Sequence, residues 1–117
     1  MPVDAKEEAG DLVHLTVRGR LTTPDQAALV YFITKAAQRH GRVRLLITLE
    51  GFAGWAPDDE WGNEALRVAD DATIVKAAFT GEARWKDDVF AFVSRPFRTI
   101  PVDYFTSEEA ARSWLAT

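Results

Sequence analysis

The feature that most constrains the fold is an apolar run in the middle of the chain, at positions 43–49. It reads Val-Arg-Leu-Leu-Ile-Thr-Leu and is nearly continuous in apolar side chains. Such a run is typical of a strand that is buried on both faces and lies parallel to a neighbouring strand. Residues 50–55 follow, with two glycines and two large aromatic side chains. The sequence thus predicts a central strand that leads into an aromatic loop.

Strands and helices alternate along the rest of the chain. Residues 12–21 place Val13, Leu15 and Val17 on one face and polar side chains on the other, which is the period of a half-buried strand. Pro101 cannot donate a backbone hydrogen bond, so it favours the sheet edge for the last strand. The predicted strands are a short one beginning at Val3 and those at 12–21, 43–49, 74–79 and 100–105, and the predicted helices lie at 23–40, 57–69, 85–94 and 106–115.

This order predicts an α/β fold in a single domain that spans residues 1–117. Strands that alternate with helices are joined by right-handed crossovers and form a mostly parallel sheet. The opening hairpin adds one antiparallel strand. We therefore expect a mixed sheet of about five strands with about four helices.

Capping residues predict where two of the helices begin. Thr23 is placed to cap the first helix, with Pro24 at its first position, Gln26 as the capping-box partner and Gly41 as its end. Residues 106–109, Thr-Ser-Glu-Glu, read as a second capping box before the last helix.

Composition narrows the classes of partner. The 117 residues carry a net charge of -4 with scattered basic residues, which argues against a nucleic-acid partner. Cysteine is absent, so neither a disulfide nor a thiolate site is possible. No apolar stretch approaches the ~20 residues of a transmembrane helix, and the first residues lack the pattern of a signal peptide. We expect a cytoplasmic protein.

The order of elements, together with four segments, resembles the bacterial SpoIIAA-like family, whose members are stand-alone relatives of the STAS domain. The segments are Gly19-Arg20-Leu21-Thr22, Leu49-Glu50-Gly51-Phe52-Ala53-Gly54-Trp55, Thr80-Gly81-Glu82-Ala83-Arg84-Trp85 and Val102-Asp103-Tyr104-Phe105. The resemblance implies a superhelical βα sheet like that of anti-sigma-factor antagonists and of CRAL-TRIO lipid-binding domains. It implies no established activity.

The resemblance does not carry over a phosphorylation switch. In the regulatory STAS proteins, the loop after the central strand presents a phosphorylatable serine at the head of the next helix. Here the corresponding residues 50–60 contain neither serine nor threonine. Asp58, Asp59 and Glu60 already place negative charge at that helix start, where phosphate would otherwise be favoured.

Large aromatic side chains at the strand exits are the candidate ligand-binding residues. Open α/β sheets bind ligands beyond the carboxyl ends of their strands, where an apolar pocket could form. The alternative is that these rings close the mouth of the sheet as part of the core. The candidates are Phe52, Trp55, Trp61, Phe79 and Trp85.

Other chemistry has weaker support in the sequence. Glu50 stands at a strand end, where a carboxyl group can act as an acid or base, but it more often accepts backbone hydrogen bonds there. Residues 58–60 are acidic, yet three consecutive residues cannot all point one way on a helix, so no metal site is expected. His14 and His40 have no evident partner in sequence. We predict no cofactor and no catalytic residue.

Two functions are favoured at this point, and a third, an enzyme that uses Glu50 or the acidic residues 58–60, stays open. The first is a non-enzymatic STAS-like module that binds a small apolar ligand, such as a lipid acyl chain, at the aromatic residues. The second is a regulatory module that binds a protein partner or forms a homodimer through an exposed aromatic patch. A Trp55 that faces an internal cavity would favour the first function, and an exposed Trp55 would favour the second.

Overall fold

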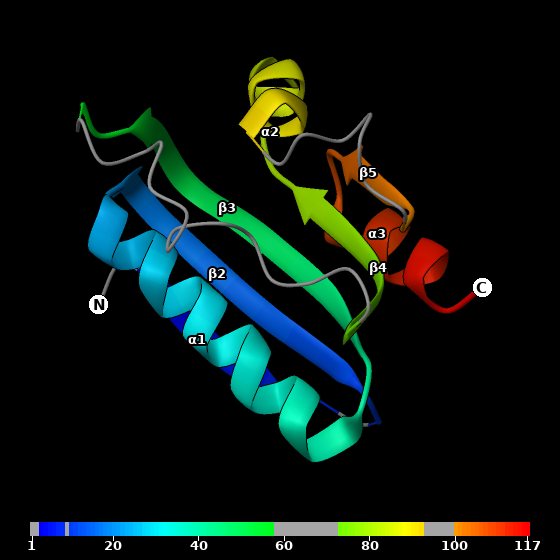
Figure 1. Ribbon diagram of the computed structural model, residues 1–117. Coiled ribbons are helices and arrows are strands. Elements are labelled where there is room, and N and C mark those ends of the chain that lie inside the picture. The colour runs from blue at the N-terminus through cyan, green and yellow to red at the C-terminus, as the bar shows by residue number, and fades with distance from the viewer. Residues whose placement is uncertain (1–2, 9, 58–72, 93–99) are drawn as a thin grey trace.

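The computed structural model describes residues 3–8, 10–57, 73–92 and 100–117, and these form one five-stranded sheet with helices on both faces (Figure 1). The elements are β1 (Val3–Glu7), β2 (Leu12–Leu21), α1 (Thr23–His40), β3 (Val43–Trp55), β4 (Ile74–Thr80), a 3₁₀ turn (Ala83–Trp85), α2 (Lys86–Phe92), β5 (Val102–Phe105) and α3 (Glu108–Leu115). The predicted helix at 57–69 lies outside the described residues.

The sheet has the predicted mixed topology. Its strand order is β1-β2-β3-β4-β5, with β1 antiparallel to β2 and all other neighbours parallel. The last strand lies at an edge, as Pro101 predicted. The expectation of an α/β fold with a five-stranded mixed sheet is therefore confirmed, with three α-helices in the described part of the chain.

Helices cover the central strand from both sides. Helix α1 packs on β1, β2 and β3, whereas α3 packs on β3, β4 and β5 (Figure 1). Successive side chains of a strand point to opposite faces, so Leu45 joins the core beneath α1, and Leu46 joins the core beneath α3 with Ala111 and Leu115. Leu45 is 2% exposed and Leu46 is fully buried. The apolar run thus forms the doubly buried strand that the sequence predicted.

The aromatic loop predicted after this strand is instead its continuation. Strand β3 extends to Trp55 and keeps pairing with β2, with Phe52 opposite Gly19 and Trp55 opposite Leu21. The register shifts on either side of Gly19, and Gly54 has a φ of 94°. Glycine tolerates such a positive φ, so the strand bends where other residues would end it.

Two capping predictions were wrong in detail. The residue that caps α1 is Thr22, whose side chain accepts from the backbone N–H of Asp25, while the Asp25 carboxylate accepts from the N–H of Thr22. Thr23 is already helical, so each member of the box lies one residue earlier than predicted.

At α3, Ser107 caps alone by accepting from the backbone N–H of Ala110, because an alanine occupies the position where a capping box needs Glu or Gln. The end of α1 at Gly41 is as predicted.

The helix predicted at 85–94 begins differently. Its first turn is the 3₁₀ segment, after which α2 takes over, and its last two residues lie outside the described part. This tight first turn brings the indole of Trp85 beside β3, where an added Cβ on Gly54 would lie 3.4 Å from the Trp85 ring.

Gly81 provides a test of the packing at the end of β4. An added Cβ there would lie 2.8 Å from the hydroxyl oxygen of Tyr104 and 3.0 Å from Cβ of Leu49. We expect Gly81→Ala to lower the free energy of unfolding by about 1–3 kcal/mol, because overpacking forces neighbours to shift. Urea denaturation measures this loss. In a Tyr104→Phe background the loss should be smaller, and an equal loss in both backgrounds would show that the hydroxyl is not the obstacle.

Candidate functional site

Three of the predicted aromatic residues form one cluster at the end of β3. The ring centroids of Phe52 and Trp55 lie 5.1 Å apart, those of Phe52 and Trp85 lie 5.0 Å apart, and those of Trp55 and Trp85 lie 6.2 Å apart. Each pair meets edge to face, at interplanar angles of 76–88°. This geometry suits the quadrupole of aromatic rings and stabilises each pair by about 0.5–1.5 kcal/mol. Phe52, which contacts both indoles, is only 4% exposed.

An apolar cavity lies under the cluster, between α1 and the sheet. Its volume is about 60 Å³, and it is bounded by apolar side chains from α1, β2, β3, β4 and α2. Phe52, Trp55 and Phe79 are among the lining residues, and Gln26 is the one polar side chain among the described residues that line it. The cavity is smaller than the ~150 Å³ engineered cavity that admits benzene. It has room for only the end of a ligand.

A second, open space lies on the outer side of the same cluster. This outer hollow has a volume of about 560 Å³ and is lined by Ala53, Gly54, Trp55, Trp85, Asp88 and Ala91. It is shallow and open to solvent, unlike the clefts that enclose most of a ligand at a typical binding site. Trp55 lines both the cavity and the outer hollow. The half-buried indole of Trp55 therefore stands between them.

Four of the five predicted ligand-binding residues are thus placed together by the fold. Phe52, Trp55 and Trp85 contact one another, and Phe79 shares the cavity. Trp61 lies outside the described residues. Whether any of them binds a ligand stays a prediction.

Glu50 lies apart from these spaces. Its carboxylate accepts a hydrogen bond from Nε of Arg18 at 3.4 Å, and Arg18 also pairs with Asp4. The Glu50 side chain is 62% exposed and lines neither the cavity nor the outer hollow among the described residues. The acidic residues 58–60 lie outside the described part of the chain.

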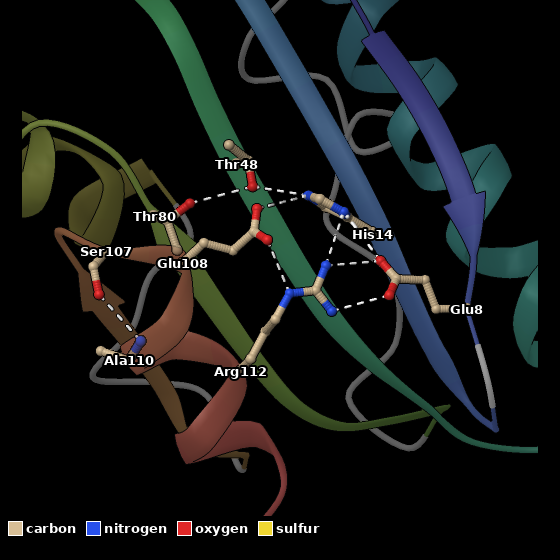
Figure 2. A network of polar contacts seen from close by, with 8 residues as sticks. All are labelled: Glu8, His14, Thr48, Thr80, Ser107, Glu108, Ala110 and Arg112. Carbon is tan, nitrogen blue, oxygen red and sulfur yellow. Dashed lines mark hydrogen bonds and ion pairs between the residues drawn. The ribbon is translucent and has the colours of Figure 1, made fainter.

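The opposite face of the sheet carries a polar network that the sequence analysis missed (Figure 2). His14 of β2 lies at its centre, with Nε2 at 2.9 Å from Oγ1 of Thr48 and Nδ1 at 3.2 Å from the Glu8 carboxylate. Thr80 donates to the Thr48 hydroxyl at 3.2 Å. Arg112 of α3 donates to both oxygens of Glu8 at 2.9 Å. The network joins three strands to the last helix.

Arg112 sets the electrostatics of the network. Its hydrogen bonds lower the pKa of Glu8 to about 2, against the opposing effect of burial. The two carboxylates of Glu8 and Glu108 in turn raise the pKa of Arg112. Glu108 accepts from Nε of Arg112 at 2.9 Å, one turn away on α3. Arg112 is therefore held as a cation between two carboxylates.

Thr48, His14 and Glu8 have the order of a nucleophile, a base and an orienting carboxylate. Nucleophilic catalysis also needs donors that stabilise the oxyanion. Thr48 lies inside β3, paired with Thr16 of β2 on one side and with Thr80 of β4 on the other, so its own backbone is engaged in the sheet. We interpret the network as structural. The sequence did contain a signal for this network, since polar residues occupy the α3-facing positions of three adjacent strands. That signal can be recognised only once the register of the sheet is known.

The described residues contain no group of three His, Asp or Glu side chains placed to hold a metal ion. Helices in the described part of the chain are all too short or too polar to cross a membrane.

The domain is a layered βα structure whose central strand ends in an aromatic cluster. The SpoIIAA-like family model matches residues 12–116, so the chain belongs to the SpoIIAA-like family. The fold also resembles the crystal structure of an uncharacterised protein with a SpoIIAA-like fold from Shewanella loihica PV-4. That similarity has a TM-score of 0.70 at 16% identity and covers 97% of this chain and 91% of the other. A similarity at 16% identity shows only that the two folds are alike. A search of curated proteins found no match.

Replacing Glu8 tests the network through pH. The pKa of Glu8 falls from an ordinary 4.5 to about 2, so its stabilising effect is complete above about pH 5 and is lost as the pH falls towards 2. Because the side chains of Glu8 and Arg112 are 23% and 35% exposed, we expect Glu8→Gln to cost about 1–2 kcal/mol of unfolding free energy at pH 7.

Urea denaturation across the pH range measures this difference. The curves of Glu8→Gln and of the unsubstituted protein should converge at low pH. Glu109→Gln is the control, since Glu109 is an exposed acid on the same helix. A cost that is the same at pH 3 and pH 7 would contradict the assignment.

Proposed function

We propose that this SpoIIAA-like domain is a non-enzymatic binding module that takes a small apolar ligand, such as an acyl chain, at Trp55. The observation that carries the proposal is that Trp55 lines both the apolar cavity and the outer hollow. The ligand lies in the outer hollow against the indoles of Trp55 and Trp85. Its end displaces Trp55 slightly and enters the cavity.

The size of the two spaces sets the expected affinity. An eight-carbon chain gains at most about 6 kcal/mol on leaving water, at roughly 0.8 kcal/mol per methylene. The loss of freedom on association removes part of this gain. We therefore expect dissociation constants on the order of hundreds of micromolar to millimolar for octyl probes, and tighter binding for longer chains.

The burial of the aromatic residues favours this function over a docking patch. Phe52 is buried, and Trp55 and Trp85 are half-buried against the core. Tyr31, on α1, is the large hydrophobic side chain that is mostly exposed in the described part, at 57%. An interaction module that acts as a homodimer would need a broader exposed apolar patch than a single tyrosine supplies.

Isothermal titration calorimetry with 1-octanol as the ligand tests the proposal. Trp55→Ala removes the wall that the two spaces share and should weaken binding about fivefold or more, since burying an aromatic wall is worth roughly 1 kcal/mol or above. Ala91→Phe fills the outer hollow from the exposed side of α2 and should weaken binding without disturbing the core.

Trp114→Ala is the matched control. Trp114 belongs to α3 and packs on Phe105, on the other face of the sheet. Binding should therefore be unchanged in this variant. No detectable heat with 1-octanol, or equal affinity in the Trp55→Ala, Ala91→Phe and Trp114→Ala variants, would overturn the proposed site.

A further inference from the structure

We propose that the ligand of the outer hollow carries an alkylammonium cation, which pairs with Asp88 while its methyl groups contact the indoles of Trp55 and Trp85. This inference rests on the proposed function, because it names the chemical class of ligand for the same site. It excludes an ionised fatty acid as the preferred ligand.

The charge of the outer hollow is the first argument. Of the described residues that line it, Ala53, Gly54, Trp55, Trp85 and Ala91 are uncharged. Asp88 is the one charged residue among them. It is exposed, and it forms no ion pair with any described residue. A carboxylate ligand would meet only negative charge in this lining, whereas an ammonium group would find a counter-ion.

Two basic side chains of the same segment, Arg84 and Lys86, do not make the lining of the outer hollow positive. Arg84 pairs with Glu82 at 3.1 Å and stacks on the Trp85 ring, with its guanidinium carbon 4.8 Å from the centroid. Lys86 lies over the ring of Phe90, at 6.0 Å from its centroid. Neither basic residue lines the outer hollow among the described residues. The guanidinium of Arg84 already lies over one face of the Trp85 indole, so a ligand cation has the Trp55 indole and the remaining surface of Trp85 to contact.

The geometry favours a methylated ammonium in particular. Cation–π attraction is best for tryptophan, and it is strongest for cations that shed water readily, such as quaternary ammonium groups. The two indoles meet edge to face and both line the outer hollow, so a group bound there can contact both of them. The alkyl chain then follows the apolar path past Trp55 towards the cavity.

Asp87 supplies the control that separates ligand binding from helix stability. Both Asp87 and Asp88 are in the first turn of α2, where negative charge stabilises the helix end. Only Asp88 lines the outer hollow. Asp87→Asn and Asp88→Asn should therefore affect the stability of the fold alike and affect ligand binding differently.

The experiment is a calorimetric titration with three probes of equal chain length: octyltrimethylammonium, 1-octanol and octanoate. Because a cation–π contact and an exposed ion pair both add to its binding, octyltrimethylammonium should bind about fivefold more tightly than 1-octanol, and octanoate should bind most weakly. Asp88→Asn should reduce the preference by about two- to threefold, and Asp87→Asn should leave it unchanged. Raising the salt to 0.5 M should weaken octyltrimethylammonium binding and leave 1-octanol binding unchanged.

The outcomes separate this inference from the proposed function. Equal binding of all three probes, or a preference that Asp88→Asn leaves undiminished, overturns the cationic ligand and leaves the apolar site intact. Tighter binding of octanoate also overturns it. Absence of binding by every probe overturns the proposed function itself, and the inference with it.

Discussion

The burial of β3 on both faces is the constraint on which the rest of the structure depends. Leu45 and Leu46 are consecutive, and both are excluded from water, so the sheet needs a helical layer on each side. Helix α1 supplies one layer and α3 the other. Parallel pairing on both sides of β3 then brings the C-terminal ends of the strands to the same edge. The aromatic cluster lies at that edge because β3 continues past its doubly buried part into Phe52 and Trp55.

The two helical layers are held in different ways. Helix α1 is 18 residues long and buries a mostly apolar face. Helix α3 has only 8 residues, and polar groups complete its attachment. Its last carbonyls accept from Arg44 and Lys76, at 2.8 Å and 2.9 Å, and Arg112 ties it to Glu8 (Figure 2). One face of the sheet is thus closed by polar contacts, and the other surrounds an apolar cavity. This asymmetry is why ligand binding is proposed on the α1 face.

Much of this architecture could be predicted from the sequence, and the exceptions have physical reasons. The period of two in β2 and the apolar run of β3 gave the sheet, because burial dictates those patterns. The bend that keeps β3 paired as far as Trp55 was missed, since glycines permit both a bent strand and a loop. The aromatic cluster was predicted as a set of residues, but only the fold shows that Trp55 lines both the cavity and the outer hollow. The partners of His14 lie 6 to 98 residues away along the chain, so the polar network could not be assembled without the register of the sheet.

The measurement that tests the central claim most directly is native mass spectrometry of the protein as purified, followed by organic extraction of whatever it carries. We expect an adduct that contains an alkyl chain, carried through purification where the chain is longer than octyl and otherwise formed with excess octyltrimethylammonium, and lost in the Trp55→Ala variant but kept in the Trp114→Ala variant. A protein that shows only its own mass, and still does so after incubation with excess 1-octanol and octyltrimethylammonium, would contradict the account.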